Sequence, residues 1–502
     1  MDSLPYISLW YVAYTLVLIG LAGYGFHRLT ILFLYLKHSR NKPEPLKKFE
    51  DLPLVTVQLP IFNEQYVVDR LFDAVAAMDY PQDKLEIQVL DDSTDDTVKI
   101  CQAGVERLKA RGFDAVYLHR TDRTGFKAGA LEEGTKVAKG EYLFILDADF
   151  VPEPDVLNKT IHFFTDDGIG MIQTRWGHIN RTFNLLTRVQ AMFLDGHLQL
   201  EQTARNRSGR FFTFNGTAGI WRKCCITDAG GWDHDTLTED MDLSYRAQLK
   251  GWRFIFLDNV VTPAELPVDM DGFKNQQHRW TKGSIQVCKK ILVNIWRSDA
   301  PLACKLEATA HLTANFAYLL LIVLCFLLYP AQSSPSFSNT TMLLINLPLF
   351  FFASVSVILF YLYAQRAIRP DSWYKEIFYL PLLLALGIGM SVNNAKAVLE
   401  ALFNHETAFV RTPKYGIEKK AAPSNSQWQK SSYKAIKSVV IPLIELAFGC
   451  FFSFVIIERI VEGHLLSAVL LLPFLGFFYT CYGSIVRLVV SLSPWKQGSP
   501  NK

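Results

Sequence analysis

The chain has 502 residues, more than a single hydrophobic core usually organises, so the sequence predicts several structural units. Its formal net charge of +3 is nearly balanced for this length and gives no basis for nucleic-acid binding. The eight cysteines form no CxxC pair and no His/Cys cluster at zinc spacing, which excludes the common structural zinc motifs.

Composition divides the chain into three parts. Half of the residues are hydrophobic, and the long apolar runs lie on either side of a stretch with ordinary globular composition. We expect an N-terminal transmembrane helix within residues 1–36, a soluble domain over 51–297 that ends in interfacial helices, and a C-terminal transmembrane region over 308–490.

The first apolar run extends from Tyr6 to Phe26, about the 20 residues needed to cross a bilayer. It lacks a basic n-region and a small-residue cleavage site, so it is typical of an anchor and not of a cleaved signal. A basic segment from Lys37 to Lys48 follows it. The positive-inside tendency then predicts an N-terminus outside the membrane and a cytosolic soluble domain.

Short β-rich runs alternate with helical stretches between Leu54 and Gln173, which is typical of a parallel sheet covered by helices. The predicted strands are Leu54–Leu59, Leu85–Leu90, Ala115–His119, Tyr142–Leu146 and Gly170–Gln173. The predicted helices are Val67–Met78, Val98–Arg111, Lys127–Lys139 and Asp155–Phe164. The absence of GxxxxGK[ST] and GxGxxG excludes a P-loop and a dinucleotide-binding fold.

Polar residues follow three predicted strands: Asn63-Glu64, Asp91-Asp92-Ser93 and Asp147-Ala148-Asp149. Ligands of open α/β sheets bind outside the carboxyl ends of the strands, so these groups predict a nucleotide site. The Asp147 and Asp149 carboxylates share one face of an extended segment and suit a divalent cation. Each motif has a simpler interpretation, because Asp, Ser and Thr also cap helices.

Two further motifs lie before and within predicted helices. Thr238-Glu239-Asp240 precedes an amphipathic helix, Met241–Lys250, either as a helix cap or with Asp240 as a general base. In Gln276-Gln277-His278-Arg279-Trp280, the arginine suits a diphosphate and the tryptophan suits stacking on a sugar. The alternative is an interfacial helix, in which Trp and Arg are common.

Four C-terminal runs are long enough to span a membrane: Leu312–Tyr329, Met342–Tyr363, Val439–Ile457 and Leu465–Val486. The stretch from Trp373 to Phe403 has a short apolar part, so we interpret it as re-entrant or interfacial. With the N-terminal anchor, this predicts five spans and a C-terminus inside the cell.

The order of these motifs resembles the processive members of glycosyltransferase family 2, which include cellulose, hyaluronan and chitin synthases. The sequence is most similar to the cellulose-synthase-like group that makes mannan and glucomannan backbones. The resemblance is dense from Leu54 to Ile291. It is carried by Gln88–Thr94, Lys127–Leu131, Phe214–Gly219 and Gln276–Trp280.

The resemblance implies a Rossmann-like GT-A fold for the cytosolic domain, combined with α-helical transmembrane segments. It implies that Asp92, with Asp91 beside it, holds the nucleoside, and that Lys127 contributes to donor binding. Asp147 and Asp149 then bind the nucleotide and Mg²⁺ or Mn²⁺.

For the reaction itself, the resemblance implies that Asp240 is the catalytic base, with Glu239 beside it. Gln276 and Arg279 then contact the diphosphate of the donor, and Trp280 stacks on the acceptor sugar. The loop Phe214-Asn215-Gly216 then lines the donor and acceptor pocket.

Within residues 405–416, the stretch Phe409–Lys414 resembles the gating loop that these synthases place over the bound donor. Arg411 departs from the Phe-x-Val-Thr-x-Lys pattern of cellulose synthases, whereas Thr412 and Lys414 match it. The resemblance implies that Lys414 reaches the diphosphate.

The function implied is a processive inverting synthase that transfers hexose from GDP-mannose or UDP-glucose to a β-linked glycan and translocates the product. It implies an integral protein of a bacterial inner membrane or of Golgi or ER membranes, with a homo-oligomer or an accessory subunit as possible assemblies. One alternative is a nonprocessive, ceramide-type glycolipid glycosyltransferase. The other, an inactive scaffold or transporter, is opposed by the complete set of acids and by the expected lack of paired intramembrane charges.

Overall fold

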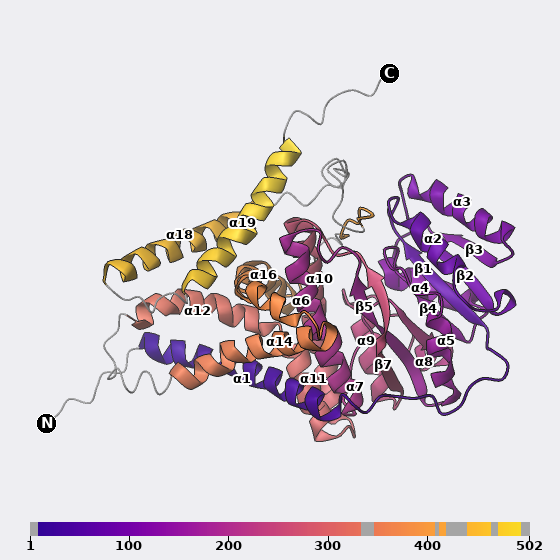
Figure 1. Ribbon diagram of the computed structural model, residues 1–502, viewed down its shortest axis with the longest axis horizontal. Helices are drawn as coiled ribbons and strands as arrows, with labels where there is room; N and C mark the ends of the chain where they lie inside the picture. Colours follow the sequence, from indigo (N-terminus) through magenta and orange to yellow (C-terminus); the bar gives the residue numbers. More distant parts are fainter. Residues whose placement is uncertain (1–8, 333–345, 407–410, 418–438, 463–469, 493–502) are drawn as a thin grey trace, which may run out of the picture.

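The computed structural model describes residues 9–332, 346–406, 411–417, 439–462 and 470–492. A sheet with its covering helices forms one part, on the right in Figure 1, and long apolar helices form the other, on the left. The elements α6, α10 and α16 lie between the two parts. The α/β class with added membrane-type helices is therefore confirmed.

The described residues form a seven-stranded sheet in the order β3-β2-β1-β4-β6-β5-β7. Its strands are β1 (Val55–Ile61), β2 (Leu85–Asp91), β3 (Asp114–His119), β4 (Tyr142–Ile145), β5 (Ile169–His178), β6 (Gly219–Arg222) and β7 (Arg253–Ala264). Only β6 runs antiparallel to its neighbours among these strands. The five predicted strands are confirmed, and the sheet is mixed because β6, which the sequence analysis did not predict, lies between β4 and β5.

Two hydrophobic cores cover the two faces of this sheet. One contains residues of α2, α3 and α5, and the other contains residues of α4, α8 and α9. The predicted helices are confirmed as α2 (Val68–Ala76), α3 (Thr97–Ala110), α4 (Phe126–Val137), and α5 (Val156–Thr160) continued by η2 (Ile161–Thr165). The remaining elements of this part are η1 (Gln82–Lys84), α8 (Lys223–Asp228), α9 (Glu239–Leu249) and α10 (Met270–Arg297).

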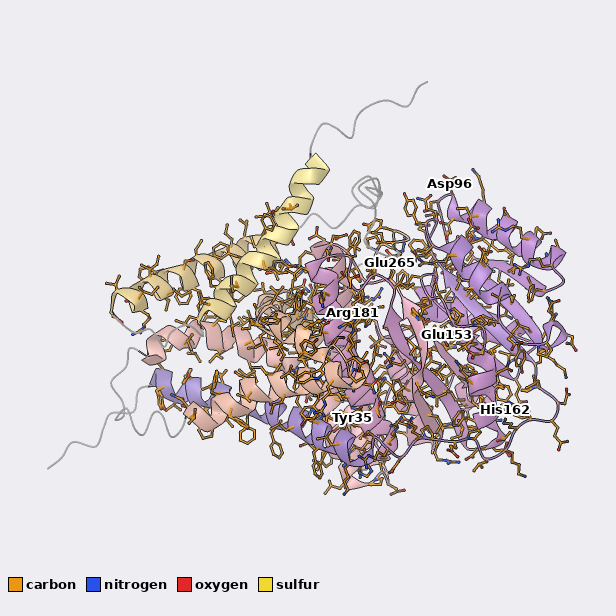
Figure 2. All side chains as sticks on the ribbon, in the orientation of Figure 1. Tyr35, Asp96, Glu153, His162, Arg181 and Glu265 are labelled. Atoms are coloured by element: carbon orange, nitrogen blue, oxygen red, sulfur yellow. The ribbon has the colours of Figure 1, made fainter. Side chains whose placement is uncertain are left out.

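A second helical segment joins the sheet to the apolar helices. It consists of α6 (Leu185–Asp195), the π-helix η3 (Gly196–Glu201) and α7 (Gln202–Arg207). The Asn184 side chain accepts a hydrogen bond from the backbone of Thr187 and starts α6. Arg181, labelled in Figure 2, bonds both Asp195 of this segment and Gln365 of a long apolar helix.

The apolar part contains α1 (Leu9–His38), α11 (Leu302–Thr313), α12 (Phe316–Gln332), η4 (Phe351–Val355), α14 (Ser356–Ile368), η5 (Trp373–Tyr379), α15 (Leu380–Gly389), α16 (Ser391–Leu402), α18 (Val440–Val461) and α19 (Leu471–Leu492). Among the described residues, four helices have the length and composition to cross a membrane: Leu9–His38, Asn346–Ile368, Trp373–Leu402 and Val440–Val461. A bent pair, Leu302–Thr313 with Phe316–Leu328, would make a fifth.

Two of the expected membrane segments can be compared with the described helices. The segment Trp373–Leu402 is helical over 30 residues with only a short break, which is long enough to span. Both of its ends nevertheless contact the soluble domain, Glu376 through Arg188 and Glu400 through His278, as the re-entrant or interfacial interpretation predicts. The last predicted span, Leu465–Val486, begins in residues 463–469, outside the described residues, and its described part is an apolar helical stretch, Leu471–Val486, within α19.

A buried ion pair connects α10 to the last two helices. The Lys274 ammonium lies 2.7 Å from a Glu445 carboxylate oxygen on α18. It also donates to the Thr480 carbonyl and to the Ser484 hydroxyl on α19. Glu445 lies within a candidate span, so the structure contains a paired charge that the sequence analysis did not expect.

Removing one partner of this pair should destabilise the protein strongly, because the other charge would remain buried. We expect Lys274→Met to cost about 3–5 kcal/mol of stability. The double variant Lys274→Met/Glu445→Met removes both charges and should recover most of the loss. Thermal unfolding of the detergent-purified proteins measures this, and equal losses in the single and double variants would contradict it.

Candidate functional site

A cleft opens at the sheet edge formed by the carboxyl ends of β1, β2, β4, β5 and β7. Helix α10 and the segment 411–417 complete its wall. Of the site residues predicted from the sequence, those that line the cleft are Asp92, Lys127, Asp147, Asp149, Asn215, Gly216, Glu239, Asp240, Gln276, Arg279, Trp280 and Lys414. Residues separated by more than 300 positions in the chain therefore converge on one concave site.

Asp91 and Phe214 do not line the cleft. The Asp91 carboxylate is fully buried and accepts hydrogen bonds from the Tyr117 hydroxyl at 2.7 Å and the Ser93 amide at 2.9 Å. Phe214 is 1% exposed and packs edge-on against Trp221. The expectation that these two residues contact ligands directly is therefore corrected, because they are buried against neighbouring strands, Asp91 beside Tyr117 of β3 and Phe214 beside Trp221 of β6.

Asp92 is held in place by an arginine that the sequence analysis did not identify. Arg120 forms a two-point ion pair with the Asp92 carboxylate, at 2.8 and 2.6 Å. The same guanidinium donates to the Phe126 carbonyl at the start of α4. Planar two-point pairs of this kind fix orientation as well as charge, so Asp92 presents a fixed carboxylate to the cleft.

The two aspartates after β4 each pair with a lysine. Lys127 pairs with Asp147 and also donates to the Gly216 carbonyl at 2.8 Å. Lys414 lies 2.6 Å from Asp149, whose same oxygen accepts the Glu265 amide at 3.1 Å. These contacts engage Oδ1 of Asp147 and Oδ2 of Asp149. Carboxylate oxygens are the hard donors that Mg²⁺ and Mn²⁺ prefer, so the donor set fits such a cation.

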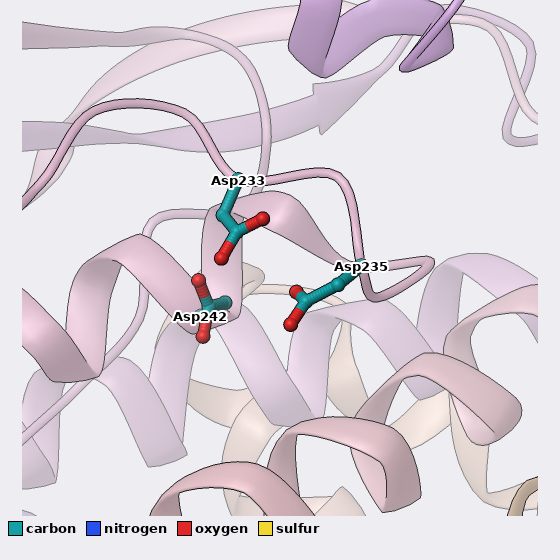
Figure 3. Close-up of side chains that lie close together, drawn as sticks. All are labelled: Asp233, Asp235 and Asp242. Atoms are coloured by element: carbon teal, nitrogen blue, oxygen red, sulfur yellow. The ribbon is translucent and has the colours of Figure 1, made fainter.

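Another acidic group, Asp233, Asp235 and Asp242, brings carboxylate oxygens within 4.8 Å of one another (Figure 3). The Lys290 ammonium already lies 2.7, 2.7 and 3.2 Å from these three residues. The Lys290 ammonium therefore lies among these carboxylates, and Arg246 also pairs with Asp242, so the geometry of the cluster does not require a metal.

Glu239 and Asp240 begin α9 and face the cleft together. Burial, followed by the negative charge of Glu239, raises the pKa of Asp240 to about 7. Burial also raises the pKa of Glu239, although the nearby Lys127 ammonium opposes this. In the described structure, Thr238 is the N-cap residue of α9 without a side-chain capping bond, and Glu239, Asp240 and Asp242 lie in the first turn, as the helix-cap interpretation predicts. A carboxyl poised near neutrality can accept a proton at physiological pH.

The loop before β6 needs glycine to approach Asp240. Gly216 has a φ of +81°, and a Cβ at this position would lie 2.9 Å from an Asp240 oxygen. Next to it, the Asn215 side-chain oxygen accepts from Gln202 at 2.8 Å. The side-chain nitrogen of Asn215 is buried and has no hydrogen-bond partner among the described residues, so it can donate to a ligand.

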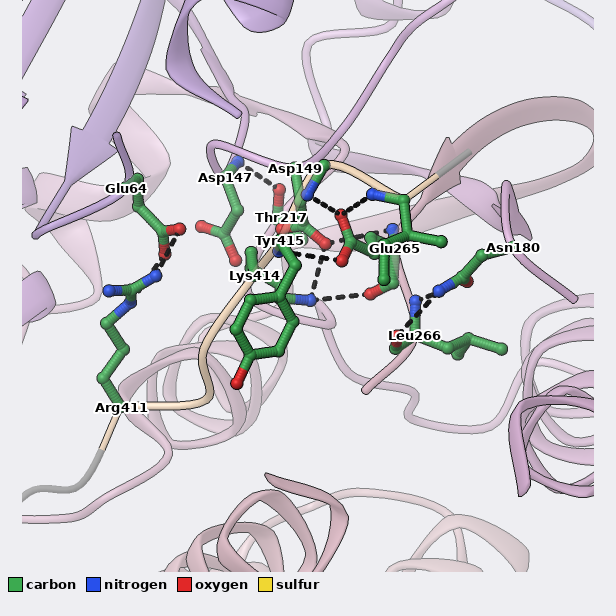
Figure 4. A network of polar contacts seen from close by, with 12 residues as sticks. Glu64, Asp147, Asp149, Asn180, Thr217, Glu265, Leu266, Arg411, Lys414 and Tyr415 are labelled. Atoms are coloured by element: carbon green, nitrogen blue, oxygen red, sulfur yellow. Dashed lines mark hydrogen bonds and ion pairs between the residues drawn. The ribbon is translucent and has the colours of Figure 1, made fainter. Parts of the chain in front are cut away.

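Three contacts hold the segment 411–417 across the cleft (Figure 4). Arg411 pairs with both Glu64 oxygens, at 2.9 and 2.5 Å, and Lys414 pairs with Asp149. The buried Glu265 carboxylate accepts the backbone amides of Tyr415, Gly416 and Ile417. Glu64 thus explains why an arginine stands at position 411. Phe409 and Val410 of the predicted loop lie outside the described residues.

Glu265 is the principal site residue that the sequence analysis missed. It follows β7, which was not predicted, and Figure 2 shows it where the sheet meets the helices. No local motif marks it, because its role depends on a segment 150 positions later in the chain.

The sequence comparisons all match glycosyltransferases. The family model described as "Glycosyltransferase like family 2" matches residues 53–283. Glucomannan 4-beta-mannosyltransferase 7 of Arabidopsis thaliana is 30% identical over 92% of this chain and 84% of its own length. Glucomannan 4-beta-mannosyltransferase 2 of the same plant is 43% identical over 53% of this chain. In that alignment, the chain spans about half the length of the relative, 52%.

Among solved structures, a mannosyltransferase from Pyrobaculum calidifontis, in complex with GDP-Man and Mn²⁺, superposes with a TM-score of 0.54. It is 20% identical, and the alignment covers 78% of this chain and all of that chain. At this level of identity, the similarity concerns the fold, and it confirms the expected GT-A type.

The raised pKa of Asp240 has a consequence for stability. The ordinary pKa of an aspartate is about 3.9, whereas that of Asp240 in the folded protein is about 7. Between these two values, Asp240 is ionised in the unfolded chain but still protonated in the folded protein, so its contribution lowers the free energy of unfolding as pH rises. We expect Asp240→Asn to stabilise the protein more at pH 8 than at pH 5.5, with a difference on the order of 1–2 kcal/mol.

Thermal unfolding at the two pH values measures this difference. The exposed Asp96→Asn variant is the control and should show the same small effect at both. A gain for Asp240→Asn that does not depend on pH would contradict the assignment.

Proposed function

Because the chain belongs to glycosyltransferase family 2, we propose that it is a processive, inverting membrane enzyme that adds hexose from a nucleotide sugar to a growing β-linked glycan. The observation that carries this proposal is the cleft in which Asp92, Asp149 and Asp240 meet Arg279 and Trp280 of one helix. This helix, α10, also contacts the apolar helices, so the product leaves the site beside them.

In this proposal, the donor lies along the carboxyl ends of the strands. Asp92, fixed by Arg120, accepts hydrogen bonds from the nucleoside. Gln276, Arg279 and Lys414 surround the diphosphate. Asp147 and Asp149 would hold Mg²⁺ or Mn²⁺, which neutralises negative charge on the leaving diphosphate when bound. The Mn²⁺ in the complex of the Pyrobaculum calidifontis mannosyltransferase supports a divalent cation.

Asp240 acts as the general base. The oxygen of an acceptor hydroxyl attacks the anomeric carbon, the bond from this carbon to the diphosphate breaks, and the hydroxyl proton passes to Asp240. A pKa near 7 keeps a substantial fraction of this carboxylate ready to accept the proton. Arg279 and Lys127, which also line the cleft, stabilise the negative charge that develops on the leaving diphosphate.

The acceptor side is formed by α10 and the loop before β6. Trp280 offers an aromatic face for the terminal sugar, and the side-chain nitrogen of Asn215 offers a hydrogen-bond donor. Gly216 leaves room between this loop and the base.

GDP-mannose is the favoured donor and UDP-glucose is the second candidate. The names of the plant relatives support mannosyl transfer. We place the catalytic domain in the cytosol, the N-terminus outside and the C-terminus inside, in a bacterial inner membrane or in Golgi or ER membranes. The candidate spans support membrane insertion. A homo-oligomer or a complex with an accessory subunit is the assembly we consider.

A donor assay tests the proposed function. Detergent-purified protein with Mn²⁺ or Mg²⁺ should convert one radiolabelled nucleotide sugar into a long, glycanase-sensitive polymer. Asp240→Asn should bind the donor normally but lose at least about 10³-fold in rate, because a positioned base contributes 10²–10⁴-fold. A single sugar on lipid would instead establish the glycolipid alternative, and substantial polymer from Asp240→Asn would refute the base assignment.

Trp280→Ala tests the acceptor side separately. Loss of the aromatic face should raise the apparent KM for the glycan acceptor about tenfold, because one stacking contact contributes about 1–1.5 kcal/mol. Hydrolysis of the donor without transfer should remain close to the wild-type rate. Equal loss of hydrolysis and transfer would show that Trp280 only anchors the helix.

A further inference from the structure

We propose that Lys414 competes with the divalent cation for Asp149, so that the metal binds together with the nucleotide diphosphate and not before it. The inference rests on the proposed function. It concerns the order in which the site acquires its charges, which depends on Lys414 and on the residues that hold its segment.

Asp147 and Asp149 already have positively charged partners in the described structure. Lys127 pairs with Asp147 and Lys414 pairs with Asp149, so each carboxylate has its own ammonium group. Arg279 lies close enough to interact with Asp147 electrostatically. A bare divalent cation would add positive charge to carboxylates that are already neutralised, in a site where charges are poorly solvated.

A diphosphate changes this balance because it brings negative charge of its own. The metal can then bridge phosphate and carboxylate oxygens, and the displaced ammonium can pair with the phosphate. The charge of the site is therefore compensated in the free protein and in the protein with both metal and diphosphate. With the metal alone, the site carries an excess of positive charge.

A second line of evidence is the way the segment 411–417 is held. Three of its backbone amides bind the buried Glu265 carboxylate, and Arg411 binds Glu64. None of these contacts uses the Lys414 ammonium. The ammonium of a lysine lies at the end of a flexible four-carbon chain. The Lys414 ammonium can therefore move from Asp149 to a phosphate while the backbone stays bound to Glu265.

The two lysines are not equivalent. Each ammonium also donates to a backbone carbonyl, Lys127 to that of Gly216 and Lys414 to that of Glu265. They differ in their backbone, because Lys127 lies on helix α4 of the sheet domain, whereas Lys414 lies in a segment between α16 and α18 whose described residues, 411–417, form no helix or strand. We therefore assign the exchange to Lys414 and a constant counter-charge to Lys127.

Mn²⁺ binding, followed by electron paramagnetic resonance of the full-length protein, tests the inference without an activity measurement. Wild-type protein should bind Mn²⁺ at least tenfold more tightly with GDP or UDP than without nucleotide. Lys414→Met should tighten binding without nucleotide about tenfold and reduce this dependence. Lys414→Arg keeps the charge and should resemble wild type, and Lys139→Met, which changes an exposed lysine, is the surface control.

The outcomes separate the inference from the proposed function. Equal Mn²⁺ affinity of wild type and Lys414→Met without nucleotide would overturn the competition but leave the enzyme assignment intact. Wild-type protein that binds no more Mn²⁺ than Asp149→Asn, with or without nucleotide, would refute the proposed metal site itself. If Lys414→Met does not fold, Lys414→Gln provides the same charge change with a polar side chain.

Discussion

Acidic side chains that gather in a partly buried cleft require matching cations, and the site depends on this constraint. An ion taken out of water without a partner costs several kcal/mol. Four of the acids are paired: Asp92 with Arg120, Asp147 with Lys127, Asp149 with Lys414 and Glu64 with Arg411. The cations come from two parts of the chain, residues 120–127 and the segment 411–417, so charge compensation also fixes how these parts are arranged.

Helix α10 transmits this arrangement to the apolar part of the molecule. Its Gln276, Arg279 and Trp280 line the cleft, while Lys274, two residues before Gln276, pairs with α18. Its close approach to the start of α9 depends on Gly283, where a Cβ would lie 2.5 Å from Thr238. One helix therefore relates the position of the proposed base, the proposed diphosphate ligands and the membrane-type helices.

The sequence predicted best what local patterns determine. Alternating β-rich runs identified five strands, and the acids at their ends converge because parallel strands end at one edge. The prediction failed where remote contacts decide: β6 is a strand through its antiparallel pairing with β4 and β5, and Glu265 binds a distant segment. Asp91 and Phe214 belong to motifs whose neighbours line the cleft, but both side chains are buried beside neighbouring strands. Adjacent positions in a motif therefore divide between the cleft wall and the core.

The Lys274–Glu445 pair also has a consequence for biosynthesis. The two residues are 171 positions apart, and the ribosome makes α10 long before α18 and α19. Until those helices are synthesised and inserted, the lysine has neither its carboxylate nor the Thr480 and Ser484 oxygens. The helix that bears the cleft residues thus settles into its final position late, which delays a working cleft until the helices beside it are in place.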